Sequence, residues 1–348
     1  MDADDAPSTR DTTSDALYVI DEDAQRSLAV QKPWARNPHH FKRVKVSALA
    51  LMKMNAHCKR GGHIEVMGMV QGYASGDAFV VTDAFELPVE GTETRVNAQA
   101  EANEYMVAYT QAFEASGRKE KVVGWYHSHP GYGCWMSGID VNTQQLNQRH
   151  FEPFVALVID PLRTSATGKV EIGAFRTYPE GYTPPNEAAT SKQGVPSNKM
   201  EDFGAHANQY YSLEVSFFKS SLDARTLDDV SARYWVNMLD SSPWCTNEKL
   251  FESWMTDVEE KLERAEKTLI RGGAPHARGS ALTPSTASNG LDASALASAT
   301  RDAVALAIEQ SKAFASYAVK RALFDAARTV DARRSDEADD AMHTDAHA

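Results

Sequence analysis

Apolar residues recur along the chain with two different periods, and these periods predict its secondary structure. A spacing of three to four residues predicts helices, at residues 44–59, 98–116, 137–150, 205–239, 250–270 and 295–330. Short apolar runs between turn residues predict strands, at residues 64–71, 79–89, 122–129, 154–160 and 169–178. Because helices and strands are mixed and several strands follow one another through short turns, we expect an α+β fold rather than a doubly wound parallel sheet.

Four segments lack an apolar period. Residues 1–28 are rich in Asp, Ser and Thr and are predicted to be a disordered tail. Residues 181–198 predict a long loop, 272–293 a flexible linker and 331–348 a charged, disordered tail. The helix at 294–330 follows the linker and has little of its own chain to pack against, so its apolar face predicts assembly with partners.

Composition excludes several classes of protein. The 348 residues contain 36 Lys and Arg against 48 Asp and Glu, a net charge of −12. An acidic chain without a basic stripe is a poor candidate for binding nucleic acid. Three cysteines are too few for a disulfide framework, which indicates a reducing compartment. The first residues do not resemble a signal peptide, and the most apolar stretch is too short to cross a membrane, so we expect a soluble intracellular protein.

The chemistry is concentrated at residues 124–140. His127 and His129 are two apart on a predicted strand, so both imidazoles project from the same face. Pro130 ends the strand, and Asp140 lies in the first turn of the next predicted helix. Two imidazoles and a carboxylate form a three-ligand zinc set, whose fourth position is left for water in catalytic sites.

Other interpretations of these residues remain open from the pattern alone. A pair of strand histidines is often ordinary polar packing. The Ser137 to Asp140 segment also fits a capping box, in which Ser caps the helix and Asp reaches back. Cys134 is a rival zinc ligand, or else a small buried thiol.

The longer motif carries a resemblance. His127-Ser-His-Pro130 is followed by six residues, Ser137, two residues and Asp140, and a glutamate lies upstream at Glu65. This pattern resembles the signature of the MPN+ (JAMM) family of zinc metalloproteases. The similarity covers residues 30–270, with a weaker helical match at 295–327, and it is closest to the COP-nine signalosome branch of that family.

The resemblance implies an MPN domain, a mixed β-sheet flanked by helices, followed by C-terminal helices. The catalytic domain would span residues 29–215, with a regulatory insertion near 86–98 and a second insertion near 181–205. Helices at 216–271 would pack on this domain. The helix at 294–330 would join a helical bundle made with other subunits.

The resemblance also assigns roles to the motif residues. His127, His129 and Asp140 would bind one Zn²⁺ per chain. Glu65 would be the general acid and base acting through water at the zinc, and Ser137 would donate a hydrogen bond to the developing oxyanion. Glu65 lies in an apolar run, so we expect burial to increase its proton affinity; the alternative is a strand glutamate that points to solvent.

The activity implied is hydrolysis of the isopeptide bond between a ubiquitin-like modifier and a lysine side chain. In the signalosome branch the substrate is a neddylated cullin, and the reaction, deneddylation, regulates cullin-RING ubiquitin ligases. The implied partners are the other signalosome subunits, including a second MPN subunit that lacks the motif. The implied location is the cytoplasm and nucleus. The alternatives are a deubiquitinase of the proteasome-lid type and a non-catalytic MPN scaffold.

The polar segment containing Thr92, Glu93 and Arg95 resembles the regulatory insertion of this branch. In isolated relatives the insertion closes the site, and the residue matching Glu93 takes the fourth zinc position. We therefore expect the isolated chain to be nearly inactive; the alternative is an ordinary solvated loop. The helical His-Glu-x-x-His motif of common metalloproteases and the Pro-Cys-x-x-Cys of zinc deaminases do not occur in the sequence.

Overall fold

The computed structural model describes residues 14–90, 96–182, 184, 195–229, 248–272 and 296–322, the last range without 313, 316 and 320. Seven strands close into a barrel in the order β1-β3-β2-β4-β5-β6-β7. Their bounds are β1 Arg43–Ser47, β2 Val66–Ser75, β3 Ala78–Glu90, β4 Lys121–Ser128, β5 Val155–Ile159, β6 Ile172–Thr177 and β7 Tyr210–Phe218. The pairs β1–β3, β1–β7 and β4–β5 are parallel and the others antiparallel. The expected α+β fold with a mixed sheet is confirmed, and closure of the sheet is an additional finding.

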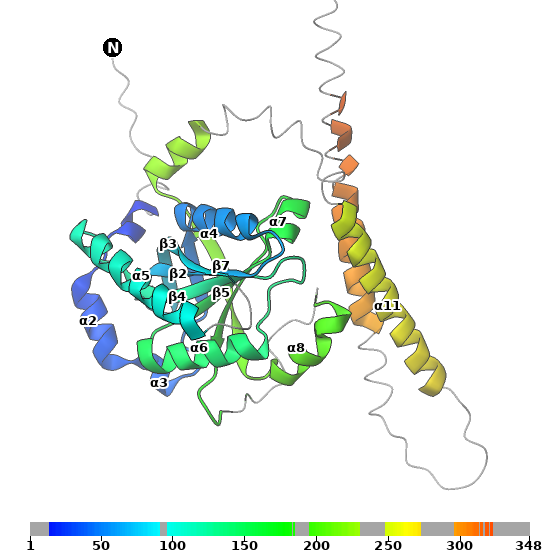
Figure 1. Ribbon diagram of the computed structural model, residues 1–348, viewed down its shortest axis with the longest axis horizontal. Helices are drawn as coiled ribbons and strands as arrows, with labels where there is room; N and C mark the ends of the chain where they lie inside the picture. Colours follow the sequence, from blue (N-terminus) through cyan, green and yellow to red (C-terminus); the bar gives the residue numbers. More distant parts are fainter. Residues whose placement is uncertain are drawn as a thin grey trace, which may run out of the picture.

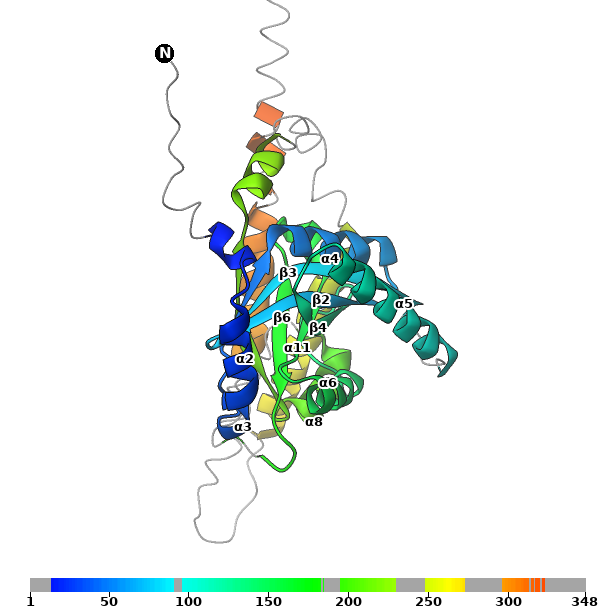
Figure 2. The same ribbon diagram turned by 90° about the vertical axis from the view of Figure 1, so that its left-hand side faces the viewer.

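Helices surround this barrel (Figure 1). They are η1 Ala16–Tyr18, α2 Glu22–Gln31, α3 Pro33–Arg36, α4 Ala48–Gly61, α5 Val96–Ala115, α6 Gly138–Phe151, α7 Pro161–Thr167, η2 Ser197–Lys199, α8 Met200–His206 and α11 Glu248–Gly272, with further helical residues at 221–229 and 296–322. In Figure 2 the strands lie between α2 on one side and α5 and α6 on the other. Within the described part of the chain, no helix is long and apolar enough to cross a membrane.

Strand β4 divides the core into two apolar clusters. Successive strand residues face opposite sides, so Tyr126 packs into the larger cluster while Trp125 packs into a second cluster with Phe154 and Val158. His127 therefore lies on the same face as Trp125. Its backbone pairs with Met67 of β2 and with Val158 of β5, which fixes it in the barrel wall.

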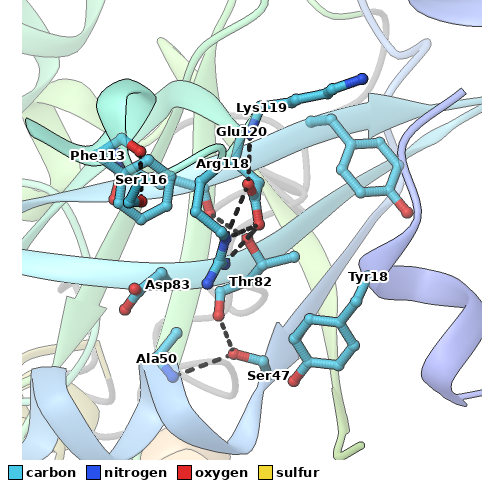
Figure 3. A network of polar contacts seen from close by, with 12 residues as sticks. Tyr18, Ser47, Ala50, Thr82, Asp83, Phe113, Ser116, Arg118, Lys119 and Glu120 are labelled. Atoms are coloured by element: carbon cyan, nitrogen blue, oxygen red, sulfur yellow. Dashed lines mark hydrogen bonds and ion pairs between the residues drawn. The ribbon is translucent and has the colours of Figure 1, made fainter. Parts of the chain in front are cut away.

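A polar network ties helix α4 and the start of β4 to the barrel (Figure 3). Ser47 accepts a hydrogen bond from the Ala50 amide at 3.1 Å, which caps α4, and its hydroxyl donates to the Thr82 carbonyl at 2.6 Å. The buried Glu120 carboxylate accepts a hydrogen bond from Arg118 Nε at 3.0 Å and another from the Thr82 hydroxyl at 3.3 Å. This network supplies partners for a carboxylate that the barrel buries.

The predicted disorder of residues 1–28 is wrong for residues 14–28. Helix α2 is capped by Asp21, whose side chain accepts hydrogen bonds from the amides of Asp23 and Ala24, both at 3.0 Å. The Tyr73 hydroxyl donates to the Leu17 carbonyl at 3.0 Å and so fastens this segment to β2. Side chains of the barrel thus order a segment that has no apolar period of its own.

Two predicted helices contain strands. Residues 44–47, predicted as the start of a helix, belong to β1, and helix α4 begins only after Ser47. Residues 210–218, predicted to be helical, form β7, which closes the barrel by pairing with β1 and β6. The five predicted strands are confirmed within a few residues. So are the predicted helices near 98–116, 137–150 and 250–270.

Several predictions fall on residues that the structure does not describe. These are residues 1–13 of the tail, most of the loop at 181–198, the segment 230–247, residues 273–293 of the linker, and residues 323–348 at the end of the last predicted helix and in the C-terminal tail. The described residues from 296 onward are helical, in agreement with the predicted helix, and the predicted start of that helix lies outside the described residues.

Candidate metal centre

Two imidazoles and one carboxylate meet at the end of β4. His127 is the penultimate residue of the strand, and the His129 amide extends the ladder by donating to the Ile159 carbonyl at 2.9 Å. Asp140 lies in the first turn of α6. All three residues are buried, with exposed fractions of 3%, 2% and 9%. The structure therefore brings together the three side chains that the sequence selected.

The spacing of their polar atoms suits one tetrahedral ion. The Nε2 atoms of the two histidines lie 3.1 Å apart. The Asp140 oxygens Oδ1 and Oδ2 lie 3.4 Å from His127 Nε2 and 3.5 Å from His129 Nε2, respectively. Ligands bound at about 2.0–2.1 Å in a tetrahedral zinc site lie about 3.3 Å from one another. The observed separations are near this value, with each aspartate oxygen close to a different histidine, and one ligand atom from each of the three residues lies within 4.8 Å of the others.

The capping box and the candidate ligand set share Asp140. Ser137 Oγ accepts a hydrogen bond from the Asp140 amide at 3.3 Å, and the Ser137 amide and hydroxyl both donate to Asp140 Oδ2 at 2.8 Å. The capping interpretation is thus confirmed, and it does not exclude the metal interpretation, because it aims the carboxylate toward the histidines.

Neighbouring side chains shift the pKa values of Asp140 and His127. Burial alone would raise the pKa of Asp140, but the adjacent His127 and His129 hold it well below its usual range. Burial would lower the pKa of His127, but the neighbouring Asp140 and Glu65 carboxylates raise it. The lowered pKa favours the ionised carboxylate, which is the form that binds a metal.

Neighbouring groups orient both rings. His129 Nδ1 lies 3.1 Å from the Gly133 carbonyl, which selects the tautomer with the proton on Nδ1 and leaves Nε2 free to ligate. The His127 ring stacks on Trp125 with centroids 4.6 Å apart. Trp125 Nε1 in turn donates to Gln144 Oε1 at 2.8 Å, which joins this stack to helix α6. Among the described residues, His127 Nδ1 has no hydrogen-bond partner.

Glu65 immediately precedes β2 and lies beside the cluster. Its side chain is exposed, so the expectation of a buried glutamate is wrong. The hydroxyl of Tyr132 donates a hydrogen bond to Glu65 Oε1. The ring of Tyr132 also packs against His129, with centroids 4.6 Å apart. The position of Glu65 is therefore set by a tyrosine on the loop after the ligands, a residue that the sequence analysis did not select.

Cys134 does not belong to the metal group found among the described residues. Its sulfur lies 3.4 Å from the Glu171 carbonyl, as a weak donor. Burial raises the pKa of this thiol well above its usual range. The interpretation as a small buried thiol is therefore favoured over that of a zinc ligand. Thr92, Glu93 and Arg95 fall within residues 91–95, outside the described part of the chain.

Comparison with known proteins identifies the family. Residues 39–153 match the family model described as JAB1/Mov34/MPN/PAD-1 ubiquitin protease, and residues 240–325 match that of the Cop9 signalosome subunit 5 C-terminal domain. COP9 signalosome complex subunit 5b of Arabidopsis thaliana is 52% identical over 318 residues, which cover 91% of this chain and 88% of the relative. Subunit 5 of Oryza sativa is 54% identical over 310 residues, covering 89% and 85%. Subunit 5 of Dictyostelium discoideum is 48% identical over 315 residues, covering 90% and 92%. The chain therefore belongs to the COP9 signalosome subunit 5 family and joins a JAB/MPN domain to the C-terminal domain of that family.

Proposed function

We propose that the protein is a zinc-dependent isopeptidase that, as subunit 5 of a COP9 signalosome, removes a ubiquitin-like modifier from cullins. The observation that carries this proposal is the tetrahedral spacing of the His127, His129 and Asp140 ligand atoms, with Glu65 beside them. The relatives are named as subunits of the COP9 signalosome complex, which supports membership of that complex. The cullin substrate and the partner subunits are the expectation from the family resemblance. From the family resemblance we also propose that the protein is located in the cytoplasm and nucleus.

The donor set fits zinc better than a harder cation. Two imidazole nitrogens and one carboxylate are typical of catalytic zinc, whereas Ca²⁺ and Mg²⁺ prefer oxygen ligands only. When bound, zinc would supply a Lewis acid that polarises the scissile carbonyl and lowers the pKa of a coordinated water to about 7. The capping box at Ser137 and the Gly133 carbonyl hold two of the three ligands in place for this ion.

Glu65 would transfer the protons of the reaction. Its carboxylate takes a proton from the attacking water and returns it to the lysine amine that leaves. The exposed position of Glu65 suits this role, because the side chain has to reach both water and a substrate that arrives from solvent. The hydrogen bond from Tyr132 restricts the carboxylate to the side of the metal centre.

Ser137 would contribute mainly by positioning Asp140. Its hydroxyl already donates to Asp140 Oδ2 at 2.8 Å, so a hydrogen bond to the developing oxyanion would require the hydroxyl to turn away from that carboxylate. The oxyanion role remains a prediction of the family resemblance. The regulatory role of Glu93 is also a prediction of the family resemblance. The low activity that we propose for the isolated chain depends on it.

The test is cleavage by the reconstituted signalosome containing either the wild-type chain or Glu65→Gln. We expect the wild-type complex to cleave a neddylated cullin faster than it cleaves ubiquitin chains, and the variant complex to assemble and retain zinc but lose turnover. Faster cleavage of ubiquitin chains would favour the proteasome-lid type of activity instead. A wild-type complex that contains no zinc and cleaves neither substrate would indicate a scaffold.

A further inference from the structure

Asp160 is a fully buried carboxylate that lies behind the metal centre and belongs to neither the ligands nor the proton-transfer group. It follows strand β5 and is the N-cap of helix α7. Oδ1 accepts hydrogen bonds from the amides of Leu162 and Arg163, at 3.1 and 2.9 Å, and from the Gly131 amide at 3.0 Å. Oδ2 accepts a hydrogen bond from the Gly133 amide at 2.9 Å. A helix cap needs only the first two of these bonds, so the other two require a different explanation.

The two additional bonds hold the turn that follows the histidine motif. Gly131 and Gly133 have φ angles of 91° and 83°, in the left-handed region that favours glycine. The Asp160 carboxylate binds this turn through both glycine amides. The position of the turn is thus set by a side chain that lies 27 residues further along the chain.

Two groups of the metal centre depend on this turn. The Gly133 carbonyl accepts the hydrogen bond that orients His129. Tyr132, between the two glycines, donates to Glu65. One carboxylate therefore fixes the backbone that positions both a ligand ring and the proton-transfer group.

The C-terminal domain covers the outer side of this arrangement. Arg163 Nε lies 3.3 Å from Asp160 Oδ2, and its guanidinium lies over the ring of Trp254 in α11, 5.0 Å from the centroid. A Cβ atom at Gly131 would lie 3.7 Å from Leu250 Cδ1, so α11 also approaches the turn itself. Helix α11 thus shields the carboxylate and its bonds from solvent, which strengthens them.

We propose that Asp160 is a positioning residue of the isopeptidase, which fixes the Gly131–Gly133 turn and through it the His129 ring and the Glu65 carboxylate. This inference rests on the proposed zinc chemistry. It assigns to Asp160 a function that helix capping alone would not require.

Asp160→Asn separates the two functions of this carboxylate. The amide oxygen can take the Oδ1 position, where it keeps the bonds from Gly131, Leu162 and Arg163. The amide NH₂ then occupies the Oδ2 position and faces the Gly133 amide and Arg163 Nε, which are both donors. Asparagine is as good an N-cap as aspartate, so α7 is retained while the bond to the Gly133 peptide is lost. The matched control is Asp21→Asn, the same substitution at the N-cap of α2, which belongs to no part of the metal centre.

The experiment measures the zinc affinity of the full-length chain by chelator competition, and kcat and KM for a neddylated cullin in the reconstituted complex. For Asp160→Asn we expect an affinity about 10- to 100-fold weaker, as for other groups that orient metal ligands, with kcat reduced and KM little changed. The control should match the wild type in all three. If the Asn variant folds poorly, Asp160→Ser, which keeps a capping oxygen on a shorter side chain, replaces it with the same expectation.

Two results would overturn the inference. One is unchanged zinc affinity and kcat in a folded Asp160 variant. The other is a melting temperature lowered equally in the metal-free and metal-loaded forms, with unchanged affinity, which would show a purely structural role. A wild-type chain that binds no zinc would instead contradict the proposed function itself.

Discussion

Ser137→Ala tests whether the capping box positions a metal ligand. The substitution removes the hydroxyl that accepts from the Asp140 amide and donates to Asp140 Oδ2. Loss of the cap costs about 1 kcal/mol, and loss of a hydrogen bond to a charged group costs about 1.5–3 kcal/mol. The Ser137 amide still donates to the carboxylate, and water can reach this half-buried position. The two terms sum to about 2.5–4 kcal/mol, and because the amide and water compensate part of this loss we expect a total near 2 kcal/mol.

The assay is thermal unfolding of the metal-free chain together with chelator competition for zinc. A change of about 2 kcal/mol in a domain of this size lowers the melting temperature by roughly 4–8 °C, and we expect weaker zinc binding as well. The matched control is Ser47→Ala, which removes another serine cap with a bond from Ala50 at 3.1 Å. This control should lose stability but not zinc affinity. If Ser137→Ala leaves stability and zinc affinity unchanged yet lowers kcat about 10²-fold or more, the positioning role is refuted and the hydroxyl acts on the oxyanion.

Three further predictions follow from other parts of the structure. Tyr132→Phe removes the donor to Glu65 and should lower kcat of the reconstituted complex while leaving zinc content unchanged, as measured by turnover assays and elemental analysis. Glu120→Gln should lower stability by about 2 kcal/mol at pH 7, as measured by denaturant unfolding, because the Arg118 bonds to a buried carboxylate are weakened. Burial alone would raise the pKa of Glu120, but Arg118 lowers it below 4.5, so the difference from wild type should persist above pH 4.5 and vanish as the pH falls through the lowered value. Deleting residues 290–348 should prevent co-purification with other signalosome subunits without loss of zinc, because this segment exposes large apolar side chains at positions such as Ile308 and Phe314.

Each of these predictions has a result that contradicts it. Unchanged turnover of Tyr132→Phe would mean that Glu65 does not need its tyrosine partner. A Glu120→Gln effect that persists in acid would assign the loss to packing rather than charge. A truncated chain that still assembles would place the interface elsewhere.

The sequence predicted which three side chains come together at the candidate metal centre better than it predicted the path of the chain. His127, His129 and Asp140 could be selected because strand alternation and a helix N-terminus are local properties. The helical period assigned to residues 205–239 concealed strand β7. Tyr211, Leu213 and Val215 alternate with polar residues, as expected for a strand. Its strand conformation depends on pairing with two distant neighbours in the barrel.

The supporting residues of the site were missed for the same reason. The Asp-Pro pair at residues 160–161 is a local signal for the start of a helix, but its bonds to the Gly131–Gly133 turn are contacts across the fold. Glu65 was placed correctly beside the cluster through the family resemblance, whereas its burial was inferred from apolar neighbours in the sequence. Of those neighbours Val66 is buried in the barrel, whereas Ile64, like the glutamate just before β2, is exposed.

The central claim is that one divalent ion is held by two histidines and an aspartate. It is tested most directly by elemental analysis of the purified full-length chain, with His127→Ala and Glu65→Gln prepared in parallel. We predict about one zinc per chain in the wild type and in Glu65→Gln, and none in His127→Ala. A wild-type chain that contains no zinc but cleaves a neddylated cullin within the reconstituted complex would contradict the account.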